Sequence, residues 1–193
     1  MPALLRSEHL TLSEPDARDI DALFTYCSDR EILRWIPLPE PYERAHAEYF
    51  VNTFVPEGRT NGTRAEWALR LEPDAPLIGV VELQFEPVHS AVIGFWIAAE
   101  QRGRGLITEA INAVVDHAFE PEGRALIRIR WEAVIGNDAS ARVARRTGFQ
   151  FEGTARAGIV FRGERKDGWH ASLLATDTRE PKDGWPPEIG RIP

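Results

Sequence analysis

The sequence is poor in the features that oxidising compartments and membranes require. Cys27 is the one cysteine among 193 residues, so the chain cannot close an intramolecular disulfide and suits a reducing compartment. No run approaches the ~20 consecutive apolar residues of a membrane-spanning helix. Residues 1–12 also lack the charged and apolar regions of a signal peptide. We therefore expect a cytoplasmic protein with no membrane partner.

Positive charge and metal-binding patterns are also scarce. The 23 lysines and arginines are outnumbered by 30 acidic residues, and the net charge of −7 argues against general affinity for nucleic acid. The five histidines are scattered, and no His or Cys cluster has the spacing of a metal site, although His46, His89 and His170 could each approach a substrate cleft. The G-x-S-x-G elbow of serine hydrolases is absent too. We expect no nucleic-acid partner, no metal and no hydrolase triad.

The length of the chain suits one domain with a full core. No internal repeat or composition break divides residues 1–178, which we expect to form that domain. Residues 179–193 contain four prolines, so we expect an irregular C-terminal tail.

Residues 92–119 combine a predicted strand, a glycine turn and a helix. Apolar, β-branched and aromatic residues at 92–98 predict a buried strand, and the apolar positions of 106–119 recur with helical spacing. Gly103 and Gly105 remove side chains from the turn between them. Such a turn leaves unpaired backbone N–H groups at a helix N-terminus, which suits a pyrophosphate. Arg102 and Arg104 add positive charge beside it.

Three phosphate-binding loops share this outline. The P-loop requires a lysine after its last glycine, and the dinucleotide fingerprint requires a third glycine where Thr108 stands, so both are disfavoured. Residues 100–105, Glu-Gln-Arg-Gly-Arg-Gly, resemble the acyl-CoA loop of the GNAT N-acetyltransferases. With residues 93–97 before it and 108–110 after it, the stretch is similar to the RimJ/RimL branch of that superfamily.

A second motif lies at residues 137–149. It begins Asn137-Asp138-Ala139-Ser140, ends Gly148-Phe149, and resembles the N-x-x-S…GF signature of the same branch. In the family the asparagine amide contacts the pantetheine or phosphate arm, and the serine hydroxyl lies near the thioester sulfur. The resemblance gives these roles to Asn137 and Ser140. Asn137 would also cap a helix without any ligand.

The predicted elements follow the order of the GNAT fold over residues 8–176. Strands are expected at 8–12, 65–71, 77–85, 92–98, 125–134, 149–161 and 169–176, with helices after Ser13, at 31–35, 42–54, 106–119 and 138–147, and a loop at 57–63. The resemblance implies an α/β (α+β) fold with a mixed, mostly antiparallel sheet. It also implies helices on both faces and a parallel pair of strands that splays apart.

The resemblance further implies direct transfer of an acetyl group from acetyl-CoA to a primary amine, on a protein N-terminus or a small molecule. Arg142 is equally consistent with binding the 3′-phosphate of CoA or lying on a solvated helix face, and for Arg146 the solvated face is favoured. A succinyl-CoA-dependent transferase and a non-catalytic acyl-CoA-sensing module remain alternatives. The expected cofactor-binding residues are Phe95, Trp96, Ile97, Arg102, Gly103, Arg104, Gly105, Leu106, Ile107, Thr108, Asn137, Ser140 and Arg142.

The acceptor pocket and the catalytic groups are harder to place. Trp35, Pro37 and Tyr42 flank a proline-rich loop and are acceptor-pocket candidates, with core packing as the alternative.

Glu82 alternates with apolar residues on strand 77–85, and burial would raise its pKa toward that of a general base. Glu66 is the reserve base, and a structural pairing of Glu82 with an arginine is the alternative. Ser140 is expected to protonate or hydrogen-bond the leaving thiolate. A homodimer through the C-terminal hairpin or the helical face would protect the edges of the long terminal strands.

Overall fold

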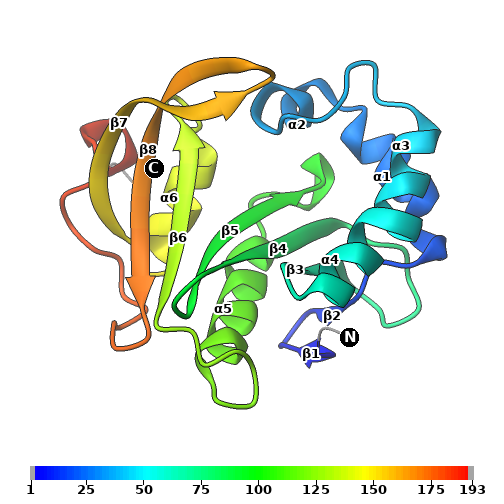
Figure 1. Cartoon of the computed structure of the whole chain (residues 1–193), viewed down its shortest axis with the longest axis horizontal. Helices are drawn as coiled ribbons and strands as arrows, with labels where there is room; N and C mark the ends of the chain where they lie inside the picture. Colours follow the sequence, from blue (N-terminus) through cyan, green and yellow to red (C-terminus); the bar gives the residue numbers. More distant parts are fainter. Residues whose placement is uncertain (1–2, 191–193) are drawn as a thin grey trace.

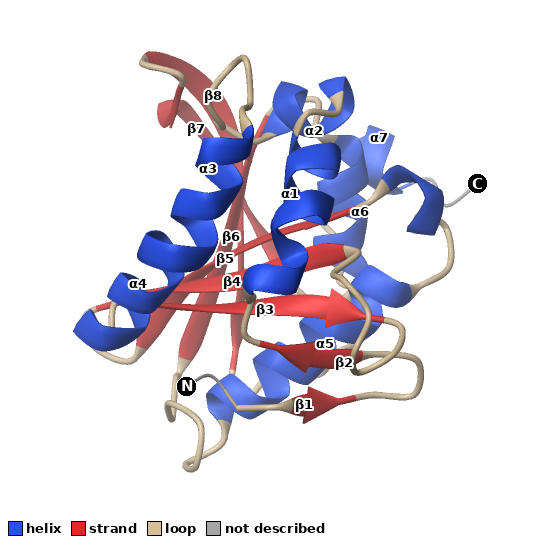
Figure 2. Cartoon of the chain, turned by 90° about the vertical axis from the view of Figure 1, so that its right-hand side faces the viewer, coloured by secondary structure: helices blue, strands red, loops and turns tan. Residues whose placement is uncertain are grey.

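The computed structural model describes residues 3–190 and folds them around one eight-stranded sheet. The strand order is β1-β2-β3-β4-β5-β6-β8-β7, and only the β5–β6 pair is parallel within the described sheet. Helices α1, α3 and α4 cover one face, and α5 and α6 cover the other (Figures 1 and 2). The fold is therefore the mixed, mostly antiparallel α/β arrangement that the sequence predicted.

The elements alternate in the order that the sequence patterns indicated. The strands are β1 Leu5–Arg6, β2 Thr11–Ser13, β3 Arg64–Arg70, β4 Gly79–Glu86, β5 Ser90–Ile97, β6 Arg128–Val134, β7 Gln150–Phe161 and β8 Glu164–Leu174. The helices are η1 Ala17–Asp19, α1 Ile20–Cys27, α2 Arg30–Trp35, α3 Arg44–Tyr49, η2 Phe50–Phe54, α4 Val55–Asn61, η3 Ala99–Gln101, α5 Leu106–Phe119, α6 Asp138–Arg146 and α7 Pro187–Gly190.

The N-terminal segment differs from the prediction in two places. The strand expected at 8–12 is a hairpin of β1 and β2, and Ser13 still belongs to β2. The helix begins three residues later, where the Asp16 side chain accepts a hydrogen bond from the Arg18 backbone. Ser13 instead accepts a hydrogen bond from the buried Arg70, which also pairs with Asp19 at 2.6 Å. The serine thus anchors a buried charge network and does not cap the helix.

The second helical region is longer than predicted. Helix α3, the π-helical segment η2 and α4 run without a break from Arg44 to Asn61, so residues 57–61 are helical where a loop was expected. Gly62, with a φ of 66°, ends the helix. Ala47, Val51 and Val55 face inward and are buried. This long helix therefore forms one wall of the molecule beside the sheet.

The central feature of the sheet is the divergence of β5 from β6. These strands pair only from Ser90↔Arg128 to Ile93↔Trp131, although each continues beyond the last pair. Figure 1 shows the two strands separating above this point. The splayed parallel pair implied by the resemblance is therefore present, and it opens the sheet between its two halves.

The C-terminal tail packs against the sheet layer. It is irregular up to Pro186, as predicted, and then forms the short helix α7. Trp185 is 8% exposed and Ile189 is 1% exposed, and both join the main core. Residues 1–178 remain our proposed domain, with residues 179–190 as a packed extension of it.

Candidate active site

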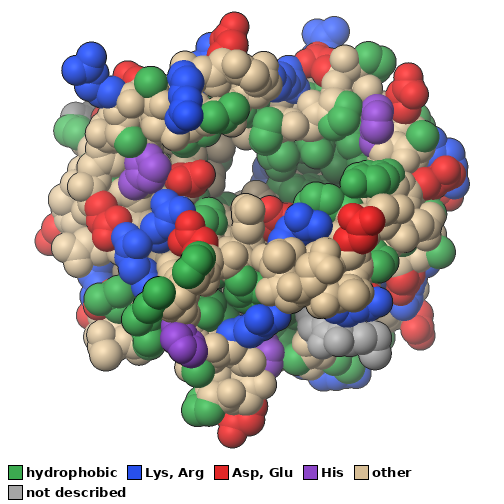
Figure 3. All heavy atoms as spheres, viewed as in Figure 1, with side chains coloured by type: hydrophobic (Ala, Val, Ile, Leu, Met, Phe, Trp, Pro, Cys, Tyr) green, Lys and Arg blue, Asp and Glu red, His purple; other side chains and the backbone are tan. Residues whose placement is uncertain are grey.

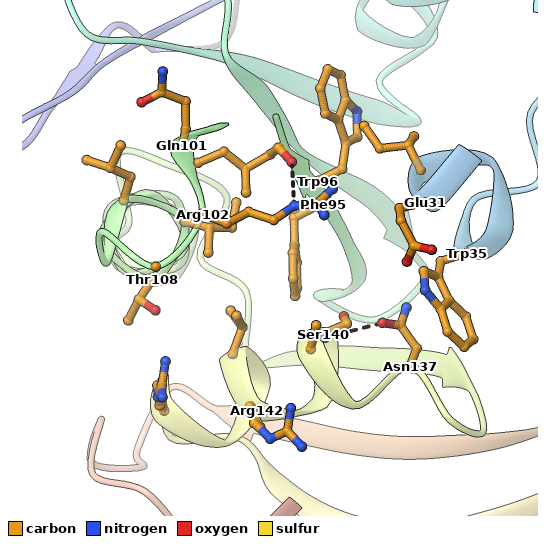
Figure 4. Close-up of a pocket in the computed structure, with 18 of the residues that line it drawn as sticks. Glu31, Trp35, Phe95, Trp96, Gln101, Arg102, Thr108, Asn137, Ser140 and Arg142 are labelled. Atoms are coloured by element: carbon orange, nitrogen blue, oxygen red, sulfur yellow. Dashed lines mark hydrogen bonds between the residues drawn. The ribbon is translucent and has the colours of Figure 1, made fainter. Parts of the chain in front are cut away.

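A cavity of about 340 Å³ lies at the splay between β5 and β6 (Figure 4). Its walls come from the end of β5, residues 101–105, the first turn of α5, helix α6 and one face of α2. All the predicted cofactor residues line it except Arg104, which is exposed and pairs with Gln101. The two sequence motifs therefore meet at one site.

The glycine loop has the backbone geometry of an anion site. Gly103 and Gly105 have φ angles of 74° and 80°, in the left-handed region that favours glycine. Gly105 is the N-cap of α5 and provides no side-chain cap, so the first N–H groups of the helix are available to a ligand. No protein atom lies within 4 Å of a Cβ built at either glycine. The loop is open, and its donors are suited to a pyrophosphate.

Asn137 and Ser140 lie at the opposite wall, at the start of α6. The Asn137 side-chain oxygen accepts a hydrogen bond of 3.3 Å from the Ser140 backbone, which confirms the predicted cap (Figure 4). Because the cap uses the oxygen, the Asn137 amide nitrogen is the group left to donate to a ligand. Ser140 Oγ accepts a hydrogen bond of 3.0 Å from the indole of Trp131.

Two arginines of α6 extend this wall. Arg142 lines the cavity and donates a hydrogen bond of 3.3 Å to the backbone oxygen of Glu188 in α7. Arg146 also lines the cavity, although a solvated helix face was the favoured expectation for it. It lies beside Arg142 because residues four apart share a helix face. Both guanidinium groups could bind a phosphate.

Helix α2 reaches the cavity, but two of the three acceptor candidates do not. Trp35 lines it, together with Glu31, Ile32 and Ile36 from the same helix face. Pro37 is exposed beyond the cavity. Tyr42 is 8% exposed and packs among buried residues of α1, α3 and β4, and burial raises the pKa of its hydroxyl.

Tyr42 packs in the core, which is the alternative that the sequence left open. The chain leaves the cavity after α2 and turns Tyr42 into the helical layer, where its ring lies 5.4 Å from that of His46. Of the three predicted acceptor residues, Trp35 lines the cavity, and the acceptor pocket stays a prediction.

The predicted carboxylates lie side by side at the start of the splay. Glu66 and Glu82 are directly opposite each other on β3 and β4, and Glu82 in turn is opposite Gly94 on β5. A Cβ built at Gly94 would lie 3.3 Å from Glu82 Oε1, so the carboxylate covers this glycine. Gly94 follows Ile93, the last β5 residue paired with β6. Neither glutamate lines the cavity itself.

Burial makes both carboxylates unusually basic. Glu66 is 1% exposed, and desolvation with repulsion from Glu82 raises the pKa of Glu66 to about 8 against the opposing charge of Arg64. Desolvation also raises the pKa of Glu82. Arg64 Nε lies 3.4 Å from Glu66 Oε1, so this arginine pairs with Glu66.

An additional acid and a histidine lie on the other side of the splay. Glu132 follows Trp131, the last β6 residue paired with β5, and its Oε2 is 3.7 Å from His170 Nδ1 on β8. The space-filling view shows an opening through the middle of the molecule, with acidic side chains and a histidine to one side of it (Figure 3). From the sequence, His170 was one of three histidines that could approach a substrate cleft, and Glu132 had no predicted role.

Within residues 3–190, no group of three His, Cys, Asp or Glu side chains is arranged to hold a metal ion. No helix in the same range is long and apolar enough to cross a bilayer.

Known proteins match both the sequence and the fold. The profile of the acetyltransferase (GNAT) domain matches residues 9–150. The chain is 31% identical over 177 residues to a protein of Bacillus subtilis (strain 168) named "Putative ribosomal N-acetyltransferase YdaF". That alignment covers 87% of this chain and 92% of its relative.

Two solved structures show the same architecture. RimJ of Mycobacterium smegmatis in complex with CoA-disulfide superposes with a TM-score of 0.76 at 20% identity, covering 90% of this chain and 86% of RimJ. The microcin C7 self-immunity acetyltransferase MccE, in complex with acetyl-CoA and AMP, gives 0.77 at 20% identity, covering 87% and 93%.

Proposed function

The chain belongs to the acetyltransferase (GNAT) family and is an N-acetyltransferase, and from that premise we propose that it transfers an acetyl group directly from acetyl-CoA to the amine of a protein N-terminus. The observation that carries the proposal is the cavity at the splay, where the glycine loop and Asn137–Ser140 face each other. The name of YdaF supports a ribosomal-protein acceptor. A small-molecule amine is the alternative acceptor.

Each part of the cavity has a group that matches one part of acetyl-CoA. The N–H groups of residues 103–108 suit the pyrophosphate, and the backbone of residues 95–97, free of β6, suits the pantetheine amides. Arg142 and Arg146 suit the 3′-phosphate. When bound, acetyl-CoA supplies an activated acetyl group.

The two glutamates can take the proton that the attacking amine must lose. With a pKa of about 8, Glu66 is mostly protonated at neutral pH, so Glu82 is the member of the pair to which we assign the amine proton. Glu82 lies over Gly94 at the splay, where an amine approaching from the open face would pass. We assign Glu82 as the base, acting directly or through water.

Ser140 completes the reaction on the cofactor side. The amine nitrogen forms a bond to the acetyl carbon, the carbon–sulfur bond breaks, and its electron pair goes to sulfur. The Ser140 hydroxyl then donates a hydrogen bond to the thiolate that leaves.

An acceptor screen that reads free thiol release tests the proposal. We expect acetyl-CoA to be used faster than succinyl-CoA, and peptides with a free N-terminus to be acetylated faster than the same peptides with a blocked N-terminus and an internal lysine. Preference for the blocked peptides would refute the N-terminal acceptor, and preference for succinyl-CoA would refute the donor. A homodimer through the β7–β8 hairpin or the helical face stays a prediction.

A further inference from the structure

The hydroxyl of Ser140 is held by a buried tryptophan. Trp131 is 1% exposed and stands at the last position where β6 pairs with β5, so the splay begins beside it. Its indole Nε1 donates a hydrogen bond of 3.0 Å to Ser140 Oγ. One side chain thus connects the point where the sheet opens to the serine on the cavity wall.

This hydrogen bond restricts what the serine can do. A hydroxyl has one hydrogen to donate and two lone pairs that accept, and the indole is a donor only. Because Trp131 occupies a lone pair, the Ser140 hydrogen is left for another acceptor. Without the indole, the side chain could occupy any of three staggered rotamers, and only one of them keeps the oxygen in its present place.

We propose that Trp131 is a positioning residue, whose indole N–H fixes the Ser140 hydroxyl so that its hydrogen points to the thioester sulfur. The inference rests on the role proposed above for Ser140. A hydroxyl that already accepts a hydrogen bond is also a stronger donor, since hydrogen bonds in a chain polarise one another. Trp131 therefore both orients and strengthens the donor that stabilises the thiolate.

The C-terminal tail supports Trp131 from behind. The ring centroid of Trp185 lies 5.6 Å from that of Trp131, and Trp185 Nε1 donates a hydrogen bond of 3.2 Å to the backbone oxygen of Phe149. Arg142 bonds the backbone of Glu188 in the same segment. The indole of Trp131 is thus held between the tail and α6.

A double-mutant cycle tests the inference. Trp131→Phe keeps an aromatic ring but removes the donor, and we expect kcat to fall about fivefold, the size of one hydrogen bond, with the KM for acetyl-CoA within about twofold of wild type. In a Ser140→Ala background the same change should have no further effect on kcat. Trp169→Phe is the matched control, because Trp169 is also buried, at 3% exposure, and belongs to the same core. It should leave kcat unchanged.

The outcomes separate the inference from the proposed function. If Trp131→Phe lowers kcat equally with and without Ser140, or no more than Trp169→Phe does, the inference is overturned while the role of Ser140 stands. If Ser140→Ala alone keeps the wild-type kcat, the role proposed for Ser140 is wrong.

A spectroscopic measurement keeps the inference testable if Trp131→Phe does not fold. The indole N–H resonance of Trp131 should move upfield in Ser140→Ala, while that of Trp169 stays in place. Addition of CoA to the wild-type protein should move the Trp131 resonance as well. An unchanged Trp131 resonance in Ser140→Ala would overturn the inference.

Discussion

At the scale of single residues, the loss of the amine proton depends on the pair of glutamates at the splay. Replacing Glu82 with Gln keeps the shape of the side chain and removes the base. We expect kcat to fall about 100-fold at neutral pH, the usual size of a general-base effect, with little change in the KM for acetyl-CoA. The loss should shrink at alkaline pH, where free amine is already present. Rates measured across this pH range check it.

Glu86→Gln is the matched control for Glu82→Gln. Glu86 lies on the same strand and the same face, but its carboxylate pairs with Arg130 at 2.6 Å. Removing this charge should leave the pH profile unchanged. Wild-type turnover in Glu82→Gln over the whole pH range would exclude Glu82 from the mechanism and leave Glu66 or bulk water as the base.

Glu66 should affect stability more visibly than rate. Its pKa is about 8 in the folded protein against an ordinary value of 4.5, so the folded state binds its proton more tightly. This stabilisation is full below pH 4.5 and is lost as pH rises to about 8. Glu66→Gln should abolish this pH dependence. Relative to wild type, the free energy of unfolding of the variant should therefore rise by on the order of a few kcal/mol as the pH increases across this range. Urea unfolding at several pH values measures the gap, and a gap independent of pH would contradict the raised pKa.

Individual residues also show where sequence reasoning reaches its limit. The strand position of Glu82 and the cap at Asn137 were predicted because strand alternation and helix capping are local rules, whereas Ser140 was named from the resemblance of residues 137–149 to a family signature. The burial of Tyr42 could not be predicted because the direction of the chain after α2 is set by tertiary contacts, which place this side chain among the helices. The hydrogen bond between Trp131 and Ser140 joins β6 to α6, so no local sequence pattern predicts it.

At the scale of elements, the glycine loop and α5 were predicted closely, because the two turn glycines and the helical periodicity after them indicate the same helix start. The helix from Arg44 to Asn61 was predicted too short because residues 57–63 are polar and contain glycine. The π-helical segment η2 directly precedes α4, and proline is tolerated in the first turn of α4. A break in the regular hydrogen-bond pattern therefore replaced the expected break in the helix.

The glycine loop yields a prediction with a close control. Gly105→Val introduces a side chain where the pyrophosphate approaches, and we expect the affinity for CoA to fall at least about tenfold, which corresponds to 1.4 kcal/mol, while the protein stays folded. Gly163 in the β7–β8 turn has the same φ of 80° and the same open surroundings. Gly163→Val therefore carries the same backbone strain without touching the loop. Calorimetric titration that finds equal CoA affinity in both variants would disprove the site.

At the scale of the whole molecule, the sheet and its two helical layers followed from the order of the elements, but the place of the tail did not. A segment with four prolines in fifteen residues has no periodicity to reveal a buried face. Its anchor is Trp185, whose ring contacts Trp131 and Phe151 at 5.6 and 5.3 Å. These contacts join the end of the chain to β6 and β7, on either side of β8.

The tail should therefore contribute to the stability of the entire domain. Trp185→Ala removes a side chain that is 8% exposed and leaves a cavity beside Trp131, which typically costs about 3–5 kcal/mol. Chemical denaturation should show one cooperative transition, shifted to lower denaturant, because the cavity lies in the core that the sheet shares with α5 and α6. Lys182→Ala is the control, since its side chain donates a hydrogen bond to the exposed Thr178 and lies outside the core. A loss below about 1 kcal/mol for Trp185→Ala, within the usual range of surface substitutions, would place the end of the folding unit at residue 178.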